Sequence, residues 1–117
     1  MTLLALGINH KTAPVALREK VAFTPDSLVE ALASLKKLEG VDESVIVSTC
    51  NRTEIYCTAD DRCPDLIGHW LEQNQEIGRT DLEASLYSLE NDDAVSHTMR
   101  VASGLDSLVL GEPQILG

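Results

Sequence analysis

The sequence predicts a single domain of mixed α/β (α+β) class, an open, mostly antiparallel sheet with helices packed on one face in the order βαββαβα. Short apolar runs alternate along the chain with segments of helical periodicity, which predicts strands and helices in one domain. Two of the apolar runs are joined by a link of only a few residues, as is typical of antiparallel neighbours. The length of 117 residues and the hydrophobic content of 44% suffice for one core.

Strands in the first half are expected where apolar runs are bounded by turn residues. They cover residues 3–8, 44–48 and 53–58. Pro14 precedes a short helical stretch at 15–21, because proline is well tolerated where a helix begins. A longer helix is expected to begin at Thr24, whose hydroxyl can cap it, and to end at Gly40.

The second half of the chain contains two helical patterns and one weak strand signal. Residues 65–74 place their apolar side chains on one face of a helix, and a short strand is expected at 85–89. Asn91 and the two aspartates after it predict the start of a last helix. We expect the apolar stripe of this helix to consist of Val95, Met99 and Ala102, with His97 lying away from it.

Charge is unevenly distributed and limits the partners that the chain can bind. The net charge is -10, and residues 1–57 carry six Lys and Arg against seven Asp and Glu, whereas residues 58–117 carry three against twelve. The acidic half repels phosphate backbones, which argues against a broad nucleic-acid footprint. A solvated acidic surface explains this half more simply than a cation site does.

The compartment is inferred from what the sequence lacks. No apolar run is long enough to span a bilayer, and the N-terminus has neither the basic start nor the cleavage site of a signal peptide. The three cysteines are an odd number, which in a chain without a secretory signal favours reduced thiols. We therefore expect a cytoplasmic protein with no membrane partner.

Cys50 is the main candidate for chemistry. It comes just after the apolar run 45–47, and Arg52 follows two residues later. A thiol at a strand end can face a crevice, and a nearby cation favours the thiolate, which is the nucleophilic form. Arg52 could also hold a substrate carboxylate through two parallel hydrogen bonds. The alternative is that Cys50 is a small core residue, as cysteines after apolar runs commonly are.

No metal site and no nucleotide cradle is predicted. The cysteines at 50, 57 and 63 have six and five residues between them, which does not match the spacing of zinc ligands. Cys57 is expected in the core and Cys63 on the surface. The seven glycines never form a G-x-G-x-x-G or P-loop pattern, so no site for a dinucleotide is recognisable.

Two further features could contribute to a site. His97 could act as an acid, a base or a polarising group near neutral pH, or it could be an ordinary hydrogen-bonded surface histidine. The segment 111–114 presents a glutamate and a glutamine beside a proline. It could bind an ammonium and a carboxylate or ester, or it could be an ordinary turn into a helix.

Three segments of the chain carry a resemblance to a known family. Residues 7–15, 48–56 and 97–117 closely resemble the N-terminal catalytic domain of glutamyl-tRNA reductase, in its bacterial form, and the resemblance covers the whole chain. It implies an oxidoreductase of tetrapyrrole and porphyrin biosynthesis. That enzyme converts glutamyl-tRNA to glutamate-1-semialdehyde with NADPH, by way of a thioester that hydride then reduces.

The resemblance also implies roles for individual residues. Cys50 would be the nucleophile that attacks the glutamyl ester, and His97 a second catalytic residue. The residues implied to bind the substrate are Thr49, Asn51, Arg52, Ser107, Glu112, Pro113 and Gln114. No metal is implied.

The resemblance sets expectations for domains and partners as well. Residues 1–117 would form the catalytic, glutamyl-binding domain, with the NADPH-binding and dimerisation domains absent from this chain. The fragment is then expected to take the acyl group without completing the reduction. Glutamyl-tRNA is the expected partner, the full-length enzyme is expected to be a homodimer, and a regulatory or downstream-enzyme partner is possible.

A rival hypothesis is a small module that binds RNA or a regulatory protein and performs no chemistry, since a fold alone does not determine function. The aromatic content of only 3% weighs against a sheet that stacks bases, and the acidity weighs against free-standing RNA binding. An unusually reactive cysteine would distinguish the enzyme from the module.

Overall fold

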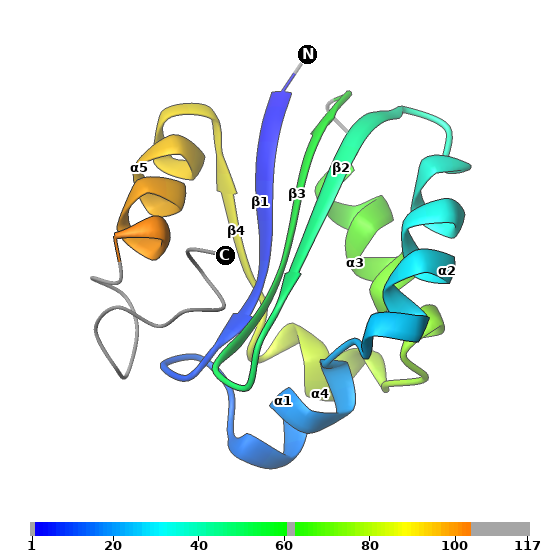
Figure 1. The fold of residues 1–117 in the computed structure, drawn as a ribbon, viewed down its shortest axis with the longest axis vertical. Coiled ribbons are helices and arrows are strands. Elements are labelled where there is room, and N and C mark those ends of the chain that lie inside the picture. Colours follow the sequence, from blue (N-terminus) through cyan, green and yellow to red (C-terminus); the bar gives the residue numbers. More distant parts are fainter. Residues whose placement is uncertain (1, 61–62, 104–117) are drawn as a thin grey trace.

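The computed structural model describes residues 2–60 and 63–103, and it confirms the predicted fold class (Figure 1). The elements in chain order are β1 (Thr2–Asn9), α1 (Val15–Val21), α2 (Pro25–Lys36), β2 (Val41–Ser48), β3 (Arg52–Ala59), α3 (Cys63–Asn74), α4 (Arg79–Glu83), β4 (Tyr87–Glu90) and α5 (Asn91–Ala102). Among these residues, no helix combines the length and the apolar character that crossing a membrane requires.

The four strands form one antiparallel sheet in the order β2-β3-β1-β4. β2 and β3 make a hairpin in which Ser48 pairs with Thr53, which confirms the prediction that these strands are antiparallel neighbours. β1 and β3 occupy the centre, and their full-length pairing ends with Asn9 opposite Arg52. The Cys50 turn and the end of β1 therefore lie at the same end of the sheet.

Helices cover both faces of the sheet, so the expectation of helices on one face is wrong. Alternate residues of β1, such as Leu4 and Leu6, belong to the apolar core with Leu35 of α2 and Ile67 of α3. Figure 1 shows α5 on the opposite side of the sheet from α2 and α3. α5 follows the edge strand β4 directly and folds back over the face that the other helices leave uncovered.

The predicted stripe of α5 is also wrong. Val95 and Met99 are 41% and 66% exposed, whereas Ala94, His97 and Val101 form the buried face at helical spacing. The sheet face beneath α5 carries polar side chains, and a helix that turns His97 inward gives them a hydrogen-bonding partner. The buried face of α5 therefore combines apolar packing by Ala94 and Val101 with the hydrogen bond that His97 makes to Glu54.

Local signals placed most of the remaining elements. Thr24 caps α2 as predicted: its Oγ1 accepts from the Ser27 amide at 3.2 Å, while Ser27 Oγ accepts from the Thr24 amide at 2.8 Å. Gly40, with a φ of +97°, lies in the turn between α2 and β2.

Asn91 connects β4 to α5 and has a φ of +49°. Its side chain accepts a hydrogen bond from the Leu3 amide, which ties this corner of the fold to β1. The short helix α4 was not predicted.

Position 7 requires a glycine because the central strands β1 and β3 approach each other closely there. A Cβ at this position would lie 2.9 Å from the Cα of Glu54 and closer still to the Thr53 carbonyl. Both are parts of β3, in which Glu54 lies opposite Gly7 in the register, and backbone atoms held in a central strand cannot move aside cheaply.

We expect Gly7→Ala to lower the free energy of unfolding by about 2 kcal/mol, the usual size of an overpacking penalty. Gly68→Ala is the matched control, because a Cβ there would meet only the flexible end of Leu86 at 3.7 Å. In a helix interior that control should be neutral or stabilising by about 1 kcal/mol. Urea unfolding of both variants tests this, and equal stabilities would contradict it.

Candidate functional site

A buried cluster of polar side chains surrounds Glu54 on the face of the sheet that α5 covers. Alternation along β3 places Arg52, Glu54 and Tyr56 on this face, and Arg52 and Glu54 are fully buried. His97 enters from α5 and is 5% exposed. Tyr87 contributes from β4, and its ring lies 5.4 Å from that of His97, centroid to centroid.

Glu54 is the acceptor for every one of these groups. The Tyr56 hydroxyl donates to Oε1 at 2.7 Å, whereas the Tyr87 hydroxyl and His97 Nε2 both bond to Oε2. Arg52 Nη1 lies 3.5 Å from the same Oε2. Because an ionised carboxylate only accepts, His97 carries a proton on Nε2.

Gly7 makes this convergence possible. Glu54 and Tyr87 belong to strands that are separated by β1, and both pair with Gly7 in the register. Since Gly7 has no side chain, the Glu54 side chain can extend across β1 to the Tyr87 hydroxyl. Any larger residue at position 7 would stand between the carboxylate and its donor.

The donors keep Glu54 ionised despite its burial. Burial alone would raise the pKa of the Glu54 carboxyl, but the hydrogen bonds from His97, Tyr87 and Tyr56 and the charge of His97 leave that pKa below its ordinary value. Burial and the Glu54 charge raise the pKa values of the Tyr56 and Tyr87 hydroxyls far above the ordinary value. Both tyrosines therefore remain protonated donors at physiological pH.

The second part of the site is the turn that carries Cys50. The Thr49 amide donates to the Arg52 carbonyl at 2.8 Å and closes a four-residue turn. Thr49 Oγ1 accepts from the amides of Asn51 and Arg52 at 3.2 and 3.3 Å. Cys50 is exposed in this turn, so the alternative of a core residue is wrong for it, whereas Cys57 is buried as predicted.

Five of the nine predicted site residues lie at this end of the sheet and its α5 face. Thr49, Cys50 and Asn51 form the turn, while Arg52 and His97 are joined through Glu54. The other four, Ser107, Glu112, Pro113 and Gln114, lie outside the described residues.

Sequence reasoning missed Glu54, Tyr56 and Tyr87. A signal for the first two was present, because Arg52, Glu54 and Tyr56 alternate with apolar residues in a strand. Charged residues at such positions in a central strand need a buried partner. Tyr87 had no comparable signal, because its strand is only four residues long.

A pocket of about 410 Å³ borders the cluster. It is lined by Asn9, Lys11, Thr12, Tyr87, Leu89, His97 and Arg100. The imidazole of His97 and the phenol of Tyr87 thus reach a cavity, which the exposed cations Lys11 and Arg100 flank. A pocket of this composition suits a small anionic group.

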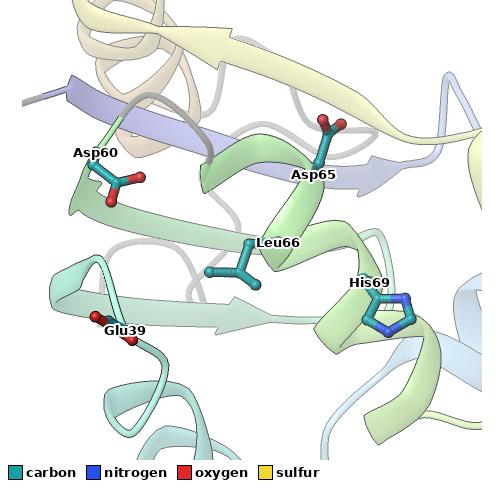
Figure 2. A pocket seen from close by; sticks show the side chains of 5 residues that line it. All are labelled: Glu39, Asp60, Asp65, Leu66 and His69. Atoms are coloured by element: carbon teal, nitrogen blue, oxygen red, sulfur yellow. The ribbon is translucent and has the colours of Figure 1, made fainter.

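A second pocket, of about 670 Å³, lies at the other end of β3 (Figure 2). It is lined by Leu66, His69 and the carboxylates of Glu39, Asp60 and Asp65. Three carboxylates disfavour an anionic ligand. Within residues 2–60 and 63–103, no three His, Cys, Asp or Glu side chains are placed to share a metal ion.

We expect Glu54→Gln to cost roughly 3 kcal/mol at pH 7, because it removes the ionised acceptor that the side chains of the buried cluster share. A carboxyl whose pKa is lowered by folding stabilises the protein above its ordinary pKa of 4.5, and this stabilisation is lost as pH falls through the folded-state value. The difference between wild type and variant should therefore shrink below about pH 4.5.

Denaturant unfolding from pH 7 to pH 3 measures this difference. Glu83→Gln is the control, because Glu83 is exposed and should change stability by less than about 0.5 kcal/mol. A Glu54→Gln penalty that is constant down to pH 3 would show that the charge of Glu54 is not what stabilises the fold.

Comparisons with known proteins agree with this architecture. The profile of the family described as "Glutamyl-tRNAGlu reductase, N-terminal domain" matches residues 6–117. The glutamyl-tRNA reductases of Pseudoalteromonas atlantica and Marinobacter nauticus are 61% and 55% identical to all 117 residues, which cover 28% and 27% of those proteins.

A solved structure is similar as well. The glutamyl-tRNA reductase of Methanopyrus kandleri superimposes with a TM-score of 0.69 at 32% identity, over 97% of this chain and 25% of that one. The chain thus spans about a quarter of the length of these relatives. The resemblance inferred from the sequence is confirmed: the chain belongs to the glutamyl-tRNA reductase family and corresponds to its N-terminal domain.

Proposed function

We propose that this chain is the catalytic domain of a glutamyl-tRNA reductase, in which Cys50 takes the glutamyl group from glutamyl-tRNA. The observation that carries the proposal is the position of Cys50. It is an exposed thiol in a hydrogen-bonded turn, two residues from a buried Arg52–Glu54–His97 cluster. A nucleophile must be accessible yet held in place, and this turn supplies both properties.

The proposed step is an acyl transfer without change of oxidation state. The Cys50 thiolate attacks the ester carbonyl carbon, a C–S bond forms, and the C–O bond to the tRNA ribose breaks. The departing ribose oxygen takes up a proton, which leaves a glutamyl thioester on Cys50 and free tRNA. The acyl group stays activated on sulfur, because a thioester carbonyl accepts hydride far more readily than a free carboxylate does.

His97 and Arg52 are proposed to serve this step from the cluster. Glu54 fixes the orientation of His97, whose ring also borders the pocket flanked by Lys11 and Arg100. That is a suitable arrangement for proton transfer or for polarising a carbonyl. Arg52 is proposed to bind the glutamyl carboxylate. A guanidinium matches a carboxylate through two parallel hydrogen bonds, and the Nη1 contact with Glu54 holds Arg52 beside the Cys50 turn.

The described residues do not fit NADPH. Their strands form an antiparallel sheet, whereas Rossmann-type folds bind dinucleotides at the carboxyl ends of parallel strands beside a glycine-rich turn, and the sequence contains no such motif. We propose that NADPH binds outside this chain.

The partners follow from the same proposal. Glutamyl-tRNA is the substrate, and the acidic second half implies that this domain contacts only its acceptor end. Thiols stay reduced in the cytosol, so a free nucleophilic cysteine favours the cytoplasm. A homodimer and a regulatory or downstream enzyme partner remain predictions for the full-length protein.

We expect Cys50→Ser to abolish thioester formation, because a serine hydroxyl at neutral pH is a far weaker nucleophile than a thiolate. The measurement is intact-protein and peptide mass spectrometry after mixing with glutamyl-tRNA. The wild type should gain one glutamyl group on the Cys50 peptide.

Cys57→Ser is the matched control, since Cys57 is buried and should not react, so this variant should still be acylated at Cys50. A glutamyl adduct on the Cys50→Ser protein would refute the assignment. An unmodified wild type would refute the proposed function of the domain.

A further inference from the structure

The turn that carries Cys50 is held from outside by α1. Arg18, on α1, donates from Nη1 to the backbone carbonyl of Cys50 at 3.2 Å, across 32 residues of sequence. The Nε atom of Arg18 is shielded from solvent, so the guanidinium is partly enclosed against the protein. Figure 1 shows α1 beside the β2–β3 turn.

A second contact joins the same two regions. The amide of Phe23, in the link that follows α1, donates to Ser48 Oγ at 2.9 Å. Ser48 is the last residue of β2, and its hydroxyl also lies 3.1 Å from the Thr53 hydroxyl on the opposite strand. The segment 18–23 is therefore attached both to the turn and to the strand pair next to it.

α1 is itself firmly anchored. Leu17 and Val21 are buried in the core, and Gln75 Nε2 donates to the carbonyls of Val21 and Ala22 at 2.7 and 3.1 Å. Gln75 follows α3, so the end of α1 is attached to a large helix of the core face. Arg18 therefore extends from a rigid base toward an exposed turn.

A hydrogen bond from a charged donor to the Cys50 carbonyl fixes the peptide plane that carries the thiol. Attack on an ester needs the sulfur within a few tenths of an ångström of its productive position, and exposed turns do not by themselves hold atoms so closely. The internal hydrogen bonds of Thr49 close the turn, whereas the Arg18 contact orients it relative to the rest of the domain.

We propose that Arg18 is a positioning residue for Cys50, which acts by holding the backbone of the nucleophile turn through its carbonyl. The proposal rests on the proposed function of Cys50. It assigns Arg18 no contact with the glutamyl group or with the tRNA.

The test compares Arg18→Met with Arg18→Gln and with Lys20→Met in the 117-residue chain. Arg18→Met removes the donor and the charge, Arg18→Gln restores an N–H donor without charge, and Lys20→Met removes an exposed charge from the same helix. The rate of Cys50 acylation is measured over a range of glutamyl-tRNA concentrations.

We expect Arg18→Met to lower the saturating acylation rate about tenfold with an unchanged half-saturating concentration, which is the loss of one charge-assisted hydrogen bond. Arg18→Gln should recover part of the rate, and Lys20→Met should match the wild type. A raised half-saturating concentration with an unchanged rate would show instead that Arg18 binds tRNA. An equal loss of acylation rate in Arg18→Met and Lys20→Met would reveal a general effect of charge. Either result would overturn the proposal.

Amide hydrogen exchange tests the same contact without substrate. The Thr49 amide, which closes the turn, should exchange about tenfold faster in Arg18→Met, while the Ile55 amide in the central sheet should not change. If wild-type Cys50 is not acylated, the proposed function fails, and the exchange data still show whether Arg18 holds the turn. If acylation occurs but the Thr49 amide of Arg18→Met exchanges at the wild-type rate, the positioning role of Arg18 is refuted and the proposed function stands.

Discussion

The ionised carboxylate of Glu54 is the group on which the α5 face of this domain depends. A fully buried charge is costly unless it is paired and hydrogen-bonded, and here two tyrosines, one histidine and one arginine share that task. Each comes from a different position in the chain: two flank Glu54 on β3, one is on β4 and one is on α5. The edge strand and the last helix are thus attached to the sheet by polar contacts as well as by apolar packing.

The same carboxylate links folding to the proposed chemistry. Because Glu54 holds His97 and contacts Arg52, two residues proposed to act on the substrate are positioned by one fully buried carboxylate. The Cys50 turn is organised differently, since its contacts run to α1 and to the segment before α2. The site therefore has a buried half that belongs to the sheet and an exposed half that belongs to a hairpin tip, and the two halves meet at Arg52.

Much of this could be predicted from the sequence, for identifiable reasons. The β2–β3 hairpin and the start of α2 depend on local signals, a short link and a threonine cap, which act over a few residues. The rotation of α5 could not be predicted from its own sequence. Val95 and Met99 are more apolar than His97, yet His97 is buried because Glu54, 43 residues earlier, offers it a hydrogen bond. Cys50, Arg52 and His97 were candidates from their residue types and positions, and the family resemblance gave them roles, whereas Glu54 became apparent only when the strands were aligned.

Gly7 shows how a residue without functional atoms can shape a site. It supplies empty space, through which a carboxylate on one strand reaches a phenol two strands away. Substitution scans that shorten side chains reveal groups that make contacts, and they have nothing to remove at a glycine. A map of this domain built from lost contacts would therefore include Glu54, Tyr87 and His97 and would overlook the position that brings them together.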